Sequence, residues 1–105
     1  MLPLLLLPSL AYADQDGQAL KSMCHGAEKV RALAVMCHSY TNGYIDAVNY
    51  ASITKGGKAR ICVHPGQKDR IPNLLSEWLL SHPEALKQPA AKTLDKVLND
   101  HFACR

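Results

Sequence analysis

The sequence predicts a small all-α domain cross-linked by two disulfide bonds. Three observations support this prediction. Apolar residues recur at three- and four-residue steps almost throughout, no segment keeps the alternation of a strand, and four cysteines follow an apolar leader. Exported chains keep their cysteines paired, and each bridge stabilises a domain of this size by about 2–4 kcal/mol. We therefore expect four helices and no free thiol.

The first 13 residues are predicted to be a signal peptide. Residues 1–10 are rich in leucine, and the small side chains of Ala11 and Ala13 suit cleavage after Ala13. The apolar stretch is about half the roughly 20 residues of a membrane-spanning helix and contains two prolines, so we expect export without membrane insertion. No Lys or Arg precedes it, which suggests a translation start upstream of Met1. Residues 14–105 are expected to form one domain.

Two helices are expected in the first half of this domain. Asp14 or Asp16 can cap a short helix that ends near Cys24. A longer helix is predicted over residues 28–53, because its apolar residues form one stripe that includes Cys37. Two successive glycines then end the helix and begin a basic loop.

Two further helices are expected in the second half, after a short apolar return. Pro72 suits the first turn of a third helix, with Asp69 slightly upstream as its cap. His82-Pro83 closes that helix, and Pro89 begins a fourth, which ends near Cys104.

The four cysteines allow three pairings, and their spacing leaves the choice open. A Cys37–Cys62 bridge is within reach, because the helix rises about 24 Å to residue 53 and nine extended residues can return about 30 Å. The rival set, Cys24–Cys37 with Cys62–Cys104, is also sterically possible.

Four stretches resemble the Rap/Tai immunity proteins of type VI secretion, in the same order and with similar gaps. They are CHSYTNGYI at 37–45, CVHP at 62–65, WLLSHP at 78–83 and HFAC at 101–104. The resemblance implies a small exported helical domain with a fold like that of the acid-stress chaperone HdeA. It also implies that the protein covers the active site of a peptidoglycan amidase toxin. Ala103 and Asp46-Ala47 depart from the usual pattern, which leaves the cognate toxin open.

The resemblance also implies a disulfide pairing and a dimer. The single bridge of the HdeA-like fold corresponds to Cys37–Cys62, which leaves Cys24 to pair with Cys104, and we adopt this pairing. Rap/Tai proteins inhibit as dimers that insert a loop into the toxin's cleft, so we expect a homodimer. The candidate partner-binding residues lie in a basic loop and in a turn: Lys55, Lys58 and Arg60, and His82, Glu84, Lys87 and Gln88.

Gly43 is an unusual residue in the middle of a helix. It costs about 1 kcal/mol relative to alanine, so we expect another helix to approach it closely. Tyr40 and Tyr44, which flank it, are expected to be half-buried helix-packing residues, with a dimer or partner contact as the alternative.

Other functional classes are disfavoured. Cysteine and histidine, which are common zinc ligands, are neighbours at 24–25 and 37–38. Adjacent side chains on a helix point about 100° apart, and disulfides consume the thiols, so we expect no metal or cofactor. Nucleophile-elbow, phosphate-loop and metalloprotease motifs are absent, so we expect no catalytic residue. A net charge of +3, interrupted by nine acids, is not typical of a nucleic-acid surface.

Two alternatives stay open. An HdeA-like periplasmic holdase chaperone would need titratable groups clustered at a dimer contact, whereas the nine acids here are scattered. An envelope adaptor with the same fold fits the sequence equally well.

Overall fold

The computed structural model describes residues 15–105, so the predicted leader and Asp14 lie outside the described residues. Four α-helices and two short 3₁₀ helices follow one another: α1 (Gly17–His25), α2 (Arg31–Thr54), η2 (Pro65–Arg70), α3 (Ile71–Ser81), η3 (Pro83–Lys87) and α4 (Ala90–Phe102). The described part contains two isolated β-bridges and no strand. The predicted four-helix, all-α class is confirmed; the two 3₁₀ helices were not predicted.

Helix α1 begins at a cap that the sequence predicted. The Asp16 carboxylate accepts a hydrogen bond from the Ala19 N–H at 2.9 Å. Gly17, the first helical residue, lies against η3, where a Cβ atom would overlap the backbone of Ala85. The Gly17 N–H donates to the carbonyl oxygen of Gln88 at 2.9 Å. The absence of a side chain at Gly17 therefore lets α1 start against η3.

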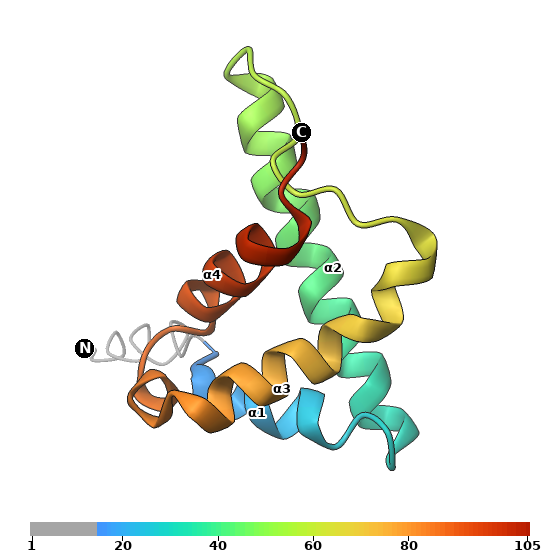
Figure 1. The fold of residues 1–105 in the computed structure, drawn as a ribbon, viewed down its shortest axis with the longest axis vertical. Coiled ribbons are helices and arrows are strands. Elements are labelled where there is room, and N and C mark those ends of the chain that lie inside the picture. Colours follow the sequence, from blue (N-terminus) through green and yellow to red (C-terminus); the bar gives the residue numbers. More distant parts are fainter. Residues whose placement is uncertain (1–14) are drawn as a thin grey trace, which may run out of the picture.

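Helix α2 extends beyond the helical bundle. It has 24 residues, which corresponds to a length of about 36 Å. Its first half packs beside α1 and α3, and its second half projects past α4 (Figure 1). Cys37 and Thr41, both in the first half, are its only fully buried residues.

The start of α3 differs in part from the prediction. Pro72 lies in the first turn as expected, but Asp69 is not the cap. Asp69 belongs to η2, and the backbone of Arg70 is already helical where η2 meets α3. Because one helix leads directly into the next, α3 begins without a side-chain cap.

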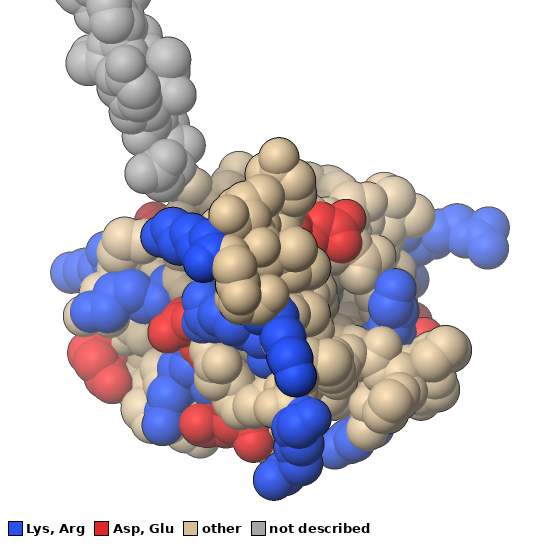
Figure 2. Space-filling view, turned by 90° about the horizontal axis from the view of Figure 1, so that it is seen from above, with Lys and Arg blue, Asp and Glu red and all other residues tan. Residues whose placement is uncertain are grey.

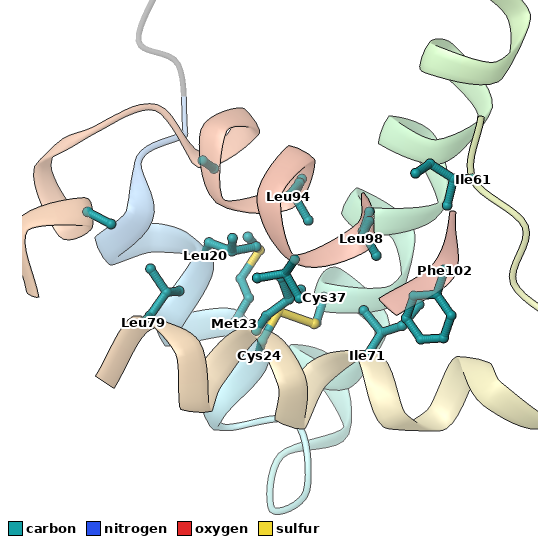
Figure 3. Packing of buried hydrophobic residues seen from close by; sticks show 14 residues of the cluster. Leu20, Met23, Cys24, Cys37, Ile61, Ile71, Leu79, Leu94, Leu98 and Phe102 are labelled. Carbon is teal, nitrogen blue, oxygen red and sulfur yellow. A yellow bond between two sulfur atoms is a disulfide. The ribbon is translucent and has the colours of Figure 1, made fainter. Parts of the chain in front are cut away.

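The core lies between α1, α3 and α4, with α2 along one side. Five leucines from the three helices have almost no exposed surface: Leu20, Leu75, Leu79, Leu94 and Leu98. Figure 3 shows all of them except Leu75 labelled in the core. Ile61 and Phe102 continue this cluster toward the projecting part of α2. The buried apolar stripes of the three helices thus form one contiguous core.

Both disulfides form, but the adopted pairing is wrong. The bridges are Cys24–Cys37 and Cys62–Cys104, and the described residues contain no free cysteine. Cys24 and Cys37 are buried where α1 and α2 pack together, with their Cα atoms 5.1 Å apart. The return segment contacts α2 at Asn49, which lies about 18 Å along the helix from Cys37. Cys62 therefore cannot reach Cys37 and pairs instead with the C-terminal tail.

Candidate functional site

The most protruding part of the described chain is a basic loop at the free end of α2. We call residues 55–60 the tip. Gly56 takes a φ of 88°, a left-handed conformation that glycine adopts without strain, and the chain reverses there. The Gly57 N–H donates to the Ser52 carbonyl oxygen at 3.0 Å, and the Ser52 hydroxyl donates to the Lys58 carbonyl oxygen at 2.6 Å. The last turn of α2 thus holds the tip in one conformation.

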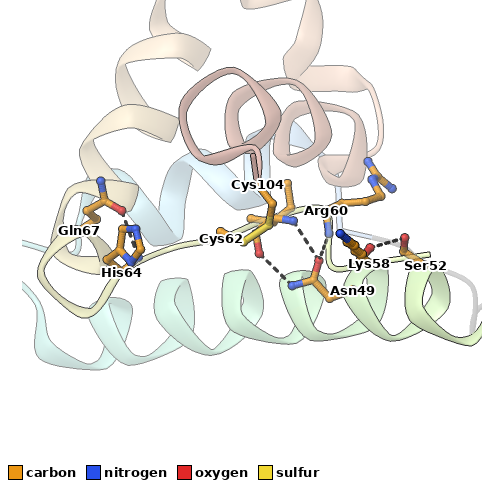
Figure 4. The surroundings of a disulfide bond; sticks show 9 residues. Asn49, Ser52, Lys58, Arg60, Cys62, His64, Gln67 and Cys104 are labelled. Carbon is orange, nitrogen blue, oxygen red and sulfur yellow. Dashed lines mark hydrogen bonds between the residues drawn. A yellow bond between two sulfur atoms is a disulfide. The ribbon is translucent and has the colours of Figure 1, made fainter. Parts of the chain in front are cut away.

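Asn49 fixes the return from the tip to the body. Its Oδ1 accepts hydrogen bonds from the backbone N–H groups of Arg60 and Ile61, at 2.8 and 3.0 Å. Its Nδ2 donates to the carbonyl oxygen of Ile61 at 2.9 Å (Figure 4). One amide side chain therefore satisfies three backbone groups of an irregular segment. Asn49 was not among the predicted site residues; the only signal for it in the sequence is a poor helix former at this position.

The second disulfide adds a covalent anchor at the same place. The Cys62 N–H donates to the Phe102 carbonyl oxygen at 2.7 Å, and the Cys104 N–H donates to that of Arg60 at 3.0 Å. Figure 4 shows the Cys62–Cys104 bridge beside the hydrogen bonds that Asn49 makes to the return segment. The tail therefore lies between the return segment and the bundle, and the base of the tip is held on both sides.

The three basic residues of the tip are not equivalent. The Arg60 guanidinium contacts the Asp95 carboxylate of α4 at 3.0 Å. The Tyr44 hydroxyl lies 3.5 Å from the same carboxylate, and burial, followed by the negative charge of Asp95, raises the pKa of Tyr44. Lys55 and Lys58 are exposed and form no ion pair with any described residue. Arg60 therefore ties the tip to α4, while the two lysines are available to a partner.

Charge on this end of the molecule is mixed. Figure 2, seen from the end at which the tip lies, shows Lys and Arg side chains over much of the face with fewer acidic side chains between them. This distribution favours an acidic partner surface over a basic one.

The predicted turn forms a separate surface. His82 stacks on Trp78 with ring centroids 3.9 Å apart, and its Nδ1 lies 2.8 Å from the Trp78 carbonyl oxygen, so it closes α3. Glu84 and Lys87 are exposed on η3, whereas the Gln88 carbonyl oxygen accepts from the start of α1. Figure 1 places η3 and the tip at opposite ends of the molecule. The structure therefore does not unite the two predicted partner surfaces.

Residues 16–104 match the family model of the Rap1a immunity proteins. The chain belongs to this family. Comparisons with curated proteins and with solved structures give no match. Rap1a proteins are immunity proteins that bind a cognate effector toxin and are typically not enzymes. The matched range includes α2, the tip and both disulfides, and paired cysteines fit an exported protein.

The remaining expected packing residues have different surroundings in this Rap1a-family domain. Tyr40 and Tyr44 are half-buried against the core. Gly43 is exposed, and no atom of another described element lies within 4 Å of the position that a Cβ would take. Within residues 15–105 no other helix approaches Gly43 closely, so packing inside the described part of the chain does not explain this glycine.

The Rap1a-family domain also has an open polar groove, of about 510 Å³, between α2 and the return segment. Asp46, His64 and Lys68 are among its lining residues. Within residues 15–105, no group of three His, Cys, Asp or Glu side chains is placed to bind a metal ion. No helix in that range has both the length and the apolar character needed to span a membrane.

Proposed function

We propose that this chain is a periplasmic immunity protein of type VI secretion. In this role it binds a peptidoglycan amidase effector as a homodimer and blocks the amidase's active site by steric occlusion. The observation that carries the proposal is the basic tip, whose base is held by Asn49 and by the Cys62–Cys104 disulfide. This tip belongs to a domain that matches an immunity family over residues 16–104. An inhibitor that enters a cleft needs a protruding segment that is ordered before binding, because ordering it on binding would weaken the complex.

The tip meets this requirement better than η3 does. The tip projects from the bundle and keeps two lysines exposed. η3 packs against the start of α1 through Gly17, and His82 is stacked on Trp78. We therefore assign toxin contact to Lys55 and Lys58.

Charge reversal at the tip tests this assignment. We expect Lys55→Glu with Lys58→Glu to weaken inhibition of the cognate amidase tenfold or more, since two favourable charges become unfavourable at the contact. The measurements are the inhibition constant on purified peptidoglycan and rescue of lysis when toxin and immunity protein are co-expressed in the periplasm.

A matched control separates the tip from general charge effects. Lys29→Glu with Lys92→Glu makes the same change in net charge on exposed residues away from the tip and outside both candidate partner surfaces. We expect it to leave inhibition within twofold of wild type. Equal losses in both variants would refute the assignment of the tip. Failure of the wild-type chain to rescue lysis by every amidase encoded beside its gene would refute the proposed function.

A further inference from the structure

The face of α2 that is turned away from the bundle has few charges. Charged residues normally line the outer face of a surface helix, yet in 24 residues α2 has only Arg31 and Asp46. Four large apolar side chains of α2 have 50–71% of their surface exposed: Val35, Met36, Tyr50 and Ile53. In Figure 4 the bundle, the return segment and the tail all lie on the other side of α2. This outer face is an unpartnered apolar surface.

Small residues occupy the centre of this face. Met36, Ser39, Gly43, Ala47 and Tyr50 follow one another at steps of three and four residues, which places them on one side of the helix. All five are exposed, and a Cβ at Gly43 would contact no described atom. A second helix could therefore approach the backbone closely at Gly43, between the larger side chains of Met36 and Tyr50.

We propose that this face binds the same face of a second copy, with the two α2 helices antiparallel and crossing at Gly43. The proposal rests on the homodimer of the proposed function and identifies its contact surface. The spacing of the face is symmetric about Gly43: Met36 lies seven residues before it and Tyr50 seven after, and Ser39 lies four before and Ala47 four after.

A two-fold axis through Gly43 uses this symmetry. It places Met36 opposite Tyr50 of the second copy, a favourable contact between a thioether and an aromatic ring. It also places Ser39 opposite Ala47 of the second copy, so that small side chains meet where the helices are closest. Such an interface is isologous, as most dimer interfaces are. An unrelated partner would not need this internal symmetry, and a parallel pair would instead oppose Tyr50 to Tyr50 and hold the helices apart.

The size of the face is sufficient for a weak dimer. A strip about 36 Å long and about 10 Å wide on each copy buries roughly 700 Å² in total, before Val35 and Ile53 at its edge are counted. This is below the about 1,000 Å² that specific, stable interfaces bury, so the contact belongs with weak, transient ones. We therefore expect a weak dimer that dissociates on dilution.

Cysteine cross-linking tests the arrangement directly. In the full chain, exported to an oxidising periplasm, Gly43→Cys should give a disulfide-linked dimer that is seen on gels only without reductant. The two Gly43 positions meet at the crossing point, and a disulfide needs Cα atoms within about 7 Å. A mixture of Met36→Cys and Tyr50→Cys chains should cross-link, whereas each alone should not. Peptide mapping identifies the bridge, and Ala91→Cys on the exposed face of α4 is the control. A disulfide between two Met36→Cys chains would overturn the proposal. So would the absence of a disulfide-linked Gly43→Cys dimer when light scattering shows that the same chain is dimeric.

Gly43→Ala provides a test without new thiols. The added methyl meets nothing in one copy, so the folded chain is retained, but two methyl groups at the crossing point would separate the helices. We expect the dimer dissociation constant, measured by sedimentation over a concentration series, to rise tenfold or more. Gly66→Ala, another site with nothing within 4 Å, should leave it unchanged. Equal dissociation constants for wild type and Gly43→Ala would overturn the proposal.

Other outcomes separate this inference from the proposed function. The wild-type chain could stay monomeric at several hundred micromolar while Met36→Lys weakens toxin inhibition. That result would assign the outer face of α2 to the toxin and overturn the proposal that a second copy binds there. A chain that dimerises through Gly43 but rescues no lysis would support this inference and refute the amidase assignment.

Discussion

Removal of the Asn49 side chain should loosen the tip without altering the core. Asn49→Ala deletes three hydrogen bonds to Arg60 and Ile61. Each contributes about 0.5–1.5 kcal/mol, but water can replace some of them because Arg60 is exposed. We therefore expect a loss of about 2 kcal/mol in the free energy of unfolding, which corresponds to about 10 °C in melting temperature. Urea unfolding followed by fluorescence of the single tryptophan measures the loss.

Amide hydrogen exchange shows where the loss occurs. The N–H groups of Arg60 and Ile61 should exchange at least tenfold faster in Asn49→Ala, while those of the core helices change only with global stability. Asn42→Ala is the matched control, since Asn42 lies two turns earlier on α2, is also half-buried, and bonds no described residue through its side chain. Unchanged exchange at Arg60 and Ile61 in Asn49→Ala would refute the reasoning that this amide holds the tip.

The remaining predictions concern individual buried groups. Thr93→Val should stabilise the chain by about 1 kcal/mol, because the buried Thr93 hydroxyl has no hydrogen-bond partner among the described residues. Thr41→Val should destabilise the chain by about the same amount, because the Thr41 hydroxyl donates to the His38 carbonyl oxygen at 3.1 Å. Thermal melts of the pair give the two signs. Gly17→Ala should cost about 3 kcal/mol in urea unfolding, because its methyl group would overlap backbone atoms of η3, and a loss below 1 kcal/mol would contradict the close approach. The pKa of Tyr44 is raised in the folded state above its usual value near 10. The stability that the protonated Tyr44 contributes is therefore complete below pH 10 and is lost as the pH rises through the raised pKa. Tyr44→Phe should reduce this alkaline loss of stability in a pH series of thermal melts.

Local patterns were sufficient to predict the four α-helices. The Asp16 cap, the apolar stripe that includes Cys37, and the position of Pro72 each depend on neighbours within a turn or two, and all three are present in the structure. Asp69 was predicted to cap α3 by the same kind of reasoning. That prediction failed because η2 runs into α3, a continuity that no local pattern indicated.

The disulfide pairing depended on long-range geometry. Cys37 and Cys62 were within reach of each other, but chain reach sets only an upper limit on distance. The pairing was decided by how far along α2 the return segment meets the helix, and Asn49 sets that point through three hydrogen bonds. The hydrogen bonds of Asn49 could not be inferred from the sequence either, because they depend on where the return segment runs. The pairing and the support of the tip were therefore unpredictable for the same reason.

Three sides of α2 serve three different purposes. The side with Cys37 faces the core, and the side with Asn49 holds the tip. The third side, centred on Gly43, has no partner among residues 15–105. If two copies pair there in an antiparallel manner, the end of each α2 lies about 16 Å from the two-fold axis on opposite sides, so the two tips are more than 30 Å apart. Each tip would then project from its own end of the dimer, and one immunity dimer could occlude two toxins without a clash between them.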